Sequence, residues 1–197
     1  MKENLNILIV GVGGQGNILL SKILGEVFLN VGYDVKISEV HGMAQRGGSV
    51  VTYVKAGTKV FSPLIDKAEA DYIIAFEKLE ALRWIEYLKK EGILIYSDYE
   101  IPPMSVITGV YKYPDVDKIV KKLGVKFYKV DIPSLLTKVG SPRVQNTIML
   151  GVFSRLIGIE ESYFRKAIEN NVKPEFVEIN LKAFAIGRNV DLGEVKI

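Results

Sequence analysis

Two glycine-rich turns constrain the fold of this chain, because each directly follows a short apolar run. The first turn is Gly11-Val12-Gly13-Gly14-Gln15-Gly16, which ends the run from Asn6 to Val10. Residues 17–30 then place apolar side chains at helical spacing, and Gly32 ends this pattern. A strand, a tight turn and a helix in this order begin a βαβ unit. The next run, Tyr33 to Val40, is expected to complete the unit as a parallel strand after a right-handed crossover.

The rest of the chain alternates strand and helix patterns and then becomes helical. We therefore expect an α/β fold, a three-layer Rossmann-like domain with a mostly parallel (mixed) sheet and a helical C-terminal third. No repeat or polar linker divides the chain, so residues 1–197 are expected to form a single domain. The further elements expected are an antiparallel hairpin of strands 49–55 and 58–62 joined through Ala56-Gly57, strands at 71–76, 92–97, 105–109 and 125–131, and helices at 77–90, 116–123, 144–157, 160–170 and 174–187.

Composition excludes several kinds of chemistry. The 197 residues include no cysteine, so this chain can supply neither a disulfide, nor a thiolate nucleophile, nor cysteine ligands for an iron–sulfur cluster. The formal net charge is +3 and the basic residues are scattered, so we expect no nucleic-acid partner. No stretch approaches the ~18 apolar residues of a membrane helix, and Met1 to Asn6 lacks the features of a secretory signal. We therefore expect a cytoplasmic protein with no membrane partner.

The first glycine turn has the spacing of a phosphate-binding turn. Gly11, Gly13 and Gly16 form the pattern Gly-x-Gly-x-x-Gly. Such glycines permit a tight turn, a close approach of backbone to phosphate, and close packing of helix on strand. Gly14 and Gln15 fill the variable positions, and the Gln15 amide can donate or accept hydrogen bonds near an approaching ligand. The alternative is that the glycines serve only the sharp turn and the packing.

The second glycine turn, residues 41–48, carries polar groups that an ordinary dinucleotide site lacks. It reads His-Gly-Met-Ala-Gln-Arg-Gly-Gly and contains the only histidine of the chain, His41. Arg46 lies between Gln45 and two glycines, so its planar fork can reach a phosphate or a carboxylate. The alternatives are structural, a hydrogen-bonded His41 and a plain surface Arg46. Because ligands of open α/β sheets bind beyond the carboxyl ends of strands, both turns are expected to share one crevice.

Taken together, these motifs resemble the gamma subunits or domains of the 2-oxoacid:ferredoxin oxidoreductases, and in particular the beta subunit of indolepyruvate ferredoxin oxidoreductase. The glycine pattern alone is weak, whereas the string at residues 41–48 is specific. The resemblance spans nearly the whole chain. Its residues are Gly11-Val12-Gly13-Gly14-Gln15-Gly16, Ser38 to Val50, Ala75-Phe76-Glu77, Leu79-Glu80-Ala81-Leu82, Asn180, Ala183-Phe184 and Gly187-Arg188.

The resemblance implies oxidative decarboxylation of an aryl 2-oxoacid, with coenzyme A as acyl acceptor, ferredoxin as electron acceptor, and thiamine diphosphate and iron–sulfur clusters as cofactors. The chain shows no Gly-Asp-Gly sequence followed by paired asparagines, the usual thiamine diphosphate signature. It is therefore expected to be the non-catalytic subunit of a hetero-oligomer, whose cysteine-rich, thiamine-dependent alpha subunit holds both cofactors. No residue of this chain is expected to be catalytic or to bind a metal. The residues expected to contact a cofactor are Gly11, Gly13, Gly14, Gln15, Gly16, Glu39, His41, Gly42, Met43, Gln45, Arg46, Gly47 and Gly48.

Three alternatives stay open. The first is a stand-alone NAD-binding protein, in which Glu39 would hold a ribose hydroxyl beside the first glycine turn. The second is a subunit of the same kind of enzyme that acts on pyruvate or a branched-chain 2-oxoacid. The third is a regulatory or purely structural module, whose glycine loops would tolerate substitution without loss of turnover. Whether coenzyme A touches this chain also stays open.

Overall fold

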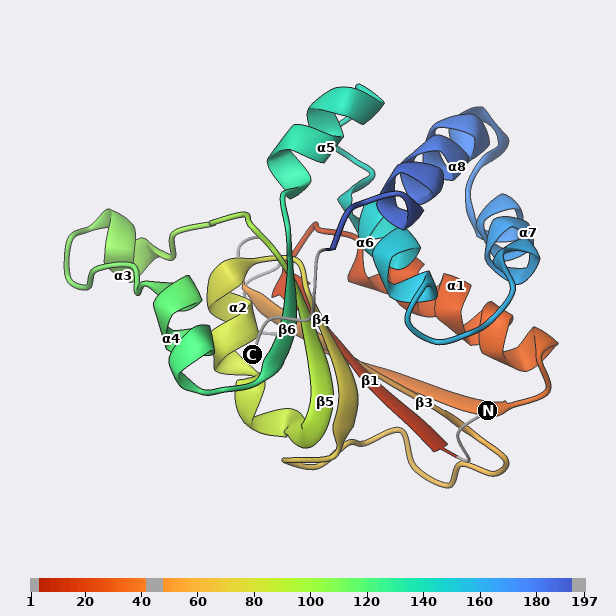
Figure 1. Cartoon of the computed structure of the whole chain (residues 1–197), viewed down its shortest axis with the longest axis horizontal. Helices are drawn as coiled ribbons and strands as arrows, with labels where there is room; N and C mark the ends of the chain where they lie inside the picture. Colours follow the sequence, from red (N-terminus) through yellow and green to blue (C-terminus); the bar gives the residue numbers. More distant parts are fainter. Residues whose placement is uncertain (1–3, 42–47, 193–197) are drawn as a thin grey trace.

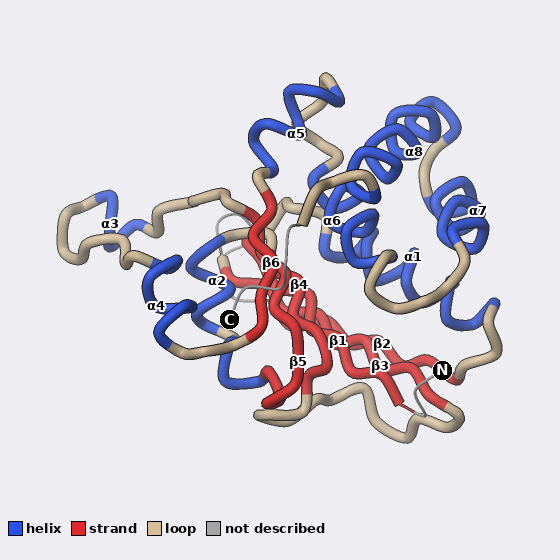
Figure 2. Tube along the Cα trace, viewed as in Figure 1, coloured by secondary structure: helices blue, strands red, loops and turns tan. Residues whose placement is uncertain are grey.

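The computed structural model describes residues 4–41 and 48–192, which form a six-stranded sheet with helices on both faces (Figures 1 and 2). None of the described helices is long and apolar enough to cross a membrane. The strands are β1 (Asn4–Val12), β2 (Asp34–His41), β3 (Ser49–Gly57), β4 (Ala70–Ala75), β5 (Leu88–Ser97) and β6 (Lys126–Val130). The helices are α1 (Asn17–Asn30), α2 (Lys78–Arg83), the 3-10 helix η1 (Ile85–Tyr87), α3 (Met104–Ile107), α4 (Val116–Lys122), α5 (Ile132–Val139), α6 (Gln145–Ser154), α7 (Glu161–Asn171) and α8 (Pro174–Arg188).

The sheet is mixed, with strand order β2-β3-β1-β4-β5-β6. Strands β1, β4, β5 and β6 are parallel, whereas β3 is antiparallel to both of its neighbours, β1 and β2. Four helices, α5 to α8, follow the last strand. The predicted α/β class, with a mostly parallel but mixed sheet and a helical C-terminal third, is confirmed.

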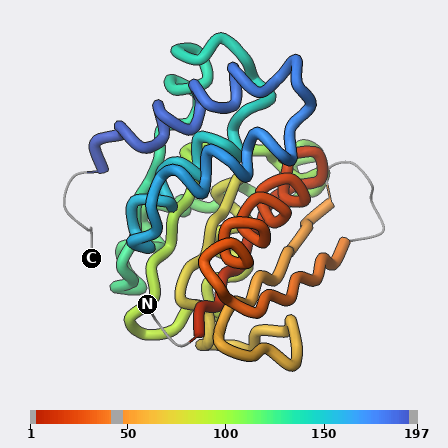
Figure 3. Tube along the Cα trace, turned by 90° about the vertical axis from the view of Figure 1, so that its right-hand side faces the viewer, coloured from red at the N-terminus to blue at the C-terminus, as the bar shows by residue number. Residues whose placement is uncertain are grey.

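Two apolar cores hold the helices onto the sheet. Along β1, Ile7 and Ile9 face a core shared with α1, α6, α7 and α8, while Leu8 and Val10 face a core shared with α2 and α4. Figure 3 looks onto the first face, where α1 lies over β2 and β3 beside α7. Because both faces of β1 and β4 are covered, these strands are nearly continuous apolar runs instead of alternating ones.

Strand β3 lies between the two strands of the predicted βαβ unit. Strand β2 runs parallel to β1, as predicted for the βαβ unit, but within the described sheet it pairs only with β3, so the two strands of the unit are not direct neighbours. The short connection between β2 and β3 explains why these two strands pair in antiparallel fashion. The predicted hairpin of 49–55 with 58–62 is also wrong, because β1 and β2 take both edges of β3. Residue Val60 donates its N–H to the Asp34 carboxylate, at 2.8 Å, instead of to a strand.

Two helix predictions are corrected. The predicted helix 77–90 divides into α2 and η1, because Leu88 already pairs with Ala70 as the first residue of β5. Helix α5 was not predicted. It follows β6 almost directly, and the Asp131 carboxylate caps it by accepting from the N–H of Ser134 at 3.2 Å.

The predicted strand 105–109 is wrong, since these residues follow the start of helix α3. The N–H groups of Val106 and Ile107 both donate to the carbonyl of Pro103, which closes a helical turn. The β-branched residues favour a strand by propensity alone. Figure 1 shows α3 extending away from the sheet, where it has no neighbouring strand to pair with.

Candidate functional site

The two glycine turns meet at the carboxyl end of β1. The N–H of Gly13 donates to the carbonyl of Gly48 at 2.9 Å, which joins the first turn to the end of the second. Within the sheet, Gly11 and His41 are both level with Val50. The described ends of both turns therefore share one edge of the sheet. Of the expected site residues, Gly42, Met43, Gln45, Arg46 and Gly47 lie outside the described residues.

The Gln15 side chain points inward and fixes the first turn to the end of β4. Its Oε1 accepts from the N–H of Val12 at 2.7 Å, and its Nε2 donates to the carbonyl of Phe76 at 3.0 Å. Gln145, at the start of α6, donates to the same carbonyl at 2.6 Å. The sequence suggested that this amide faces an approaching ligand. In the structure it instead holds the turn in place.

Gln15→Leu is expected to lower the free energy of unfolding by about 1–3 kcal/mol, because the N–H of buried Val12 loses its acceptor. Gln15→Glu is the matched control. It keeps an acceptor for Val12, but its second carboxylate oxygen replaces the donor to the Phe76 carbonyl, which still receives Gln145. Urea denaturation measures both variants. A leucine variant as stable as the wild type would contradict this role.

The backbone at Gly14 is the open part of the first turn. The N–H groups of Gly13 and Gln15 already donate within the two turns. Gly14 has a φ of +100°, and a Cβ added to it would meet no atom of the described residues within 4 Å. Helix α1 begins after Gly16 without a side-chain cap. Backbone N–H groups at a helix N-terminus favour an anion, so an anionic group can approach at Gly14.

Gly16 makes room for a different helix from the one expected. A Cβ at Gly16 would lie 2.6 Å from Nδ2 of Asn146, and Asn146 donates to the Gly16 carbonyl at 3.4 Å. Asn146 is buried near the start of α6. The third glycine of the motif therefore admits α6 to the turn.

Glu39 binds its own neighbours in the sheet. It accepts from the buried hydroxyl of Thr52 at 3.0 Å, and its other carboxylate oxygen contacts Nε2 of His41. Strand β3 lies between Glu39 and the strand of the first glycine turn. That arrangement separates the two by two strand spacings, ~10 Å. The geometry therefore disfavours a ribose contact and with it the NAD alternative.

Two buried carboxylates organise the same edge, and sequence reasoning did not assign them to the site. Glu77 and Glu80 are only 1% and 3% exposed. Glu80 accepts from the hydroxyl of Ser49, directly after the second turn, at 2.5 Å, and pairs with Arg83 at 3.0 Å. The signal available in the sequence was the position of Glu77 directly after the apolar run 71–76, with Glu80 three residues further on.

Glu77 accepts three hydrogen bonds. The N–H of Glu80, at 2.9 Å, caps α2, and the N–H of Ile101 donates at 3.0 Å. The third donor is the Tyr113 hydroxyl. Burial, and then the bond to the carboxylate, hold the pKa of Tyr113 well above its usual value, so the phenol stays protonated and donates. The described residues contain no group of three His, Cys, Asp or Glu side chains placed to hold a metal ion.

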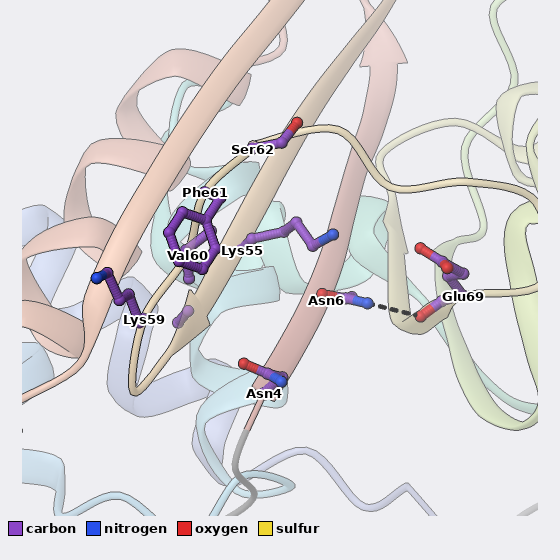
Figure 4. Close-up of a pocket in the computed structure, with 9 residues that line it drawn as sticks. Asn4, Asn6, Lys55, Lys59, Val60, Phe61, Ser62 and Glu69 are labelled. Atoms are coloured by element: carbon purple, nitrogen blue, oxygen red, sulfur yellow. Dashed lines mark hydrogen bonds between the residues drawn. The ribbon is translucent and has the colours of Figure 1, made fainter.

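A separate hollow of about 470 Å³ lies at the amino end of β1 (Figure 4). Its lining includes Asn4, Lys59 and Phe61, and Asn6 donates there to the carbonyl of Glu69 at 3.1 Å. The glycine turns follow the carboxyl end of the same strand. The hollow is therefore not part of the candidate site.

Comparison with known proteins agrees with the fold and the motifs. Among curated relatives, the indolepyruvate oxidoreductase subunit IorB of Thermococcus kodakarensis is 39% identical over 95% of this chain and 95% of its own. The solved pyruvate oxidoreductase subunit PORC of Thermotoga maritima is 23% identical, with a TM-score of 0.71 over 94% of this chain and 96% of that one.

A longer relative contains the same fold as one part. The 2-oxoglutarate:ferredoxin oxidoreductase of Magnetococcus marinus, solved with 2-oxoglutarate, coenzyme A and succinyl-CoA bound, is 20% identical, with a TM-score of 0.73. The match covers 98% of this chain and 32% of that one. Residues 6–190 match the sequence pattern described as "Pyruvate ferredoxin/flavodoxin oxidoreductase". Since that pattern spans nearly the whole sequence, the chain belongs to the pyruvate ferredoxin/flavodoxin oxidoreductase family.

Proposed function

We propose that this chain is the non-catalytic subunit of an indolepyruvate:ferredoxin oxidoreductase. The observation that carries the proposal is the 39% identity to IorB over 95% of both chains. The companion alpha subunit is proposed to hold thiamine diphosphate and the iron–sulfur clusters, because this sequence has no cysteine for cluster ligands. The chain is proposed to act as a single domain in the cytoplasm.

The edge with the two glycine turns is proposed to face the active site of the companion and to contact coenzyme A. Coenzyme A supplies the thiol that accepts the acyl group. The open backbone at Gly14 and the uncapped start of α1 suit one of its phosphates. Arg46, with its planar donor fork, is proposed to add a second contact, and His41 a third.

Gly14→Ala is expected to raise the KM for coenzyme A of the assembled enzyme about tenfold, because a methyl group at the turn would stand in the path of a phosphate. Gly32→Ala is the matched control. Gly32 has a φ of +90°, and a Cβ there also meets no described atom within 4 Å, but it follows the opposite end of α1. Both variants should lose about 1 kcal/mol of stability to backbone strain. Only the Gly14 variant should raise the KM for coenzyme A.

Arg46→Ala should likewise lower activity of the complex while the fold stays intact. Unchanged kinetics in both Gly14→Ala and Arg46→Ala would favour a purely structural module.

A purified complex that turns over pyruvate or a branched-chain acid with higher kcat/KM than indolepyruvate would correct the substrate alone. Calorimetric binding of NAD to the isolated chain would revive the nucleotide alternative.

A further inference from the structure

The segment 101–111 contains no charged residue. It contains α3 and extends away from the sheet in Figures 1 and 2, and we call it the α3 arm. Its side chains Met104, Ile107, Val110 and Tyr111 are 69%, 65%, 68% and 68% exposed. Large apolar side chains gathered without charges on a projecting segment mark an interaction site.

The α3 arm has a defined shape of its own. The N–H of Tyr111 donates to the carbonyl of Ser105 at 2.9 Å, and the Thr108 hydroxyl donates to the carbonyl of Met104 at 2.8 Å. At its base, Ile101 donates to the buried Glu77 carboxylate. An arm held in this way presents its apolar side chains without a large ordering cost on binding.

The base of the α3 arm lies on the edge that carries the glycine turns. Glu77 directly follows Phe76, whose carbonyl accepts from Gln15 of the first turn. The carbonyl of Tyr99, just before the arm, accepts from the N–H of Lys78 at 3.0 Å. The glycine turns and the arm thus follow the carboxyl ends of β1, β4 and β5. A partner that covers the turns would therefore also contact the arm.

We propose that the α3 arm docks into an apolar groove of the companion alpha subunit. This inference rests on the proposed function. Permanent interfaces between unlike subunits are more apolar than transient ones, which fits a charge-free arm. Because the base of the arm lies beside the first glycine turn, which is proposed to face the companion, the groove that receives the arm is placed on the companion and not on a second copy of this chain.

The test uses the purified complex that reduces a dye with indolepyruvate and coenzyme A. The double variant Met104→Glu/Ile107→Glu should raise the Kd for the companion by at least about 30-fold, as expected for burying charges at the centre of an interface. Phe61→Glu is the control. Phe61 is 84% exposed, but it lies near the amino end of β1, whereas the arm and the glycine turns follow the carboxyl ends of the strands. It should leave the Kd unchanged. Circular dichroism verifies folding of each variant.

Hydroxyl-radical footprinting of the wild type gives an independent readout. Met104 and Tyr111 should be oxidised in the free chain and protected in the complex, whereas Phe61 should react equally in both. A double variant that binds like the wild type, or an arm that reacts equally in both states, overturns the inference while the subunit role stands. Self-association of the wild type that the double variant abolishes, with companion binding unchanged, would assign the arm to a second copy. If the wild type forms no active complex with any companion, the proposed function itself fails.

Discussion

Gly187→Ala is expected to destabilise the protein by about 3 kcal/mol or more, because it forces apart two helices in backbone contact. Gly187 of α8 packs on Gly151 of α6. A Cβ at Gly187 would fall on the carbonyl oxygen of Ile148 and lie 3.1 Å from Cα of Gly151. Backbone atoms cannot rotate away as the end of a side chain can. Urea denaturation followed by circular dichroism measures the loss.

Gly25→Ala is the matched control for this prediction. Gly25 also lies inside a helix, α1, but a Cβ there would meet only Cδ1 of Ile37, at 2.9 Å. Ile37 is 40% exposed, so its side chain has room to move. Alanine has a helix propensity about 1 kcal/mol better than glycine, which offsets the adjustment. Equal losses in the two variants would show that the contact between α6 and α8 is not the cause.

Glu77→Ala is expected to cost about 3–5 kcal/mol of stability, since it strands three hydrogen-bond donors at a site that is 1% exposed. The N–H of Glu80 loses its cap, and Ile101 and Tyr113 lose their shared acceptor. The base of the α3 arm should loosen with them. Chemical denaturation measures the free energy, and hydrogen exchange at Ile101 should quicken more than exchange in β1.

Glu86→Ala provides the comparison for an exposed carboxylate. Glu86 pairs with Lys67 at 2.9 Å, and both side chains are more than half exposed. Such surface pairs contribute little to stability, because solvent screens them. A double-mutant cycle of Glu77→Gln with Tyr113→Phe would then isolate the buried contact. Losses of similar size at Glu77 and Glu86 would contradict the conclusion that the three buried hydrogen bonds of Glu77 stabilise the fold.

Local chemistry explains which parts of the fold could be predicted. The strand, turn and helix at residues 6–30 followed from apolar spacing and glycine positions, which depend only on neighbours in sequence. The position of β3 could not be predicted in the same way. Residues 34–41 have the same pattern whether they pair with β1 or with β3, and the pairing depends on contacts between distant parts of the chain.

The same distinction applies to the candidate site, where some features follow from local sequence and others depend on distant contacts. That both glycine turns end at one edge could be expected from strand direction, and the bond between Gly13 and Gly48 joins their described ends. The role of Glu77 could not be expected, because its donors Ile101 and Tyr113 belong to a segment more than 20 residues later in the chain. The Gln15 amide turns inward because the N–H of Val12, at the end of β1, needs an acceptor there.

The strand order also determines how this sheet can meet other chains. The described sheet ends at β2 on one side and β6 on the other. Strand β2 carries Asp34, Lys36 and Glu39, and β6 carries Lys126 and Lys129. Charged edge strands resist addition of a further strand, because continuing the sheet would bring these charges against a new backbone. Growth of the sheet across a subunit boundary is thereby discouraged, and association is directed to the loops at the ends of the strands.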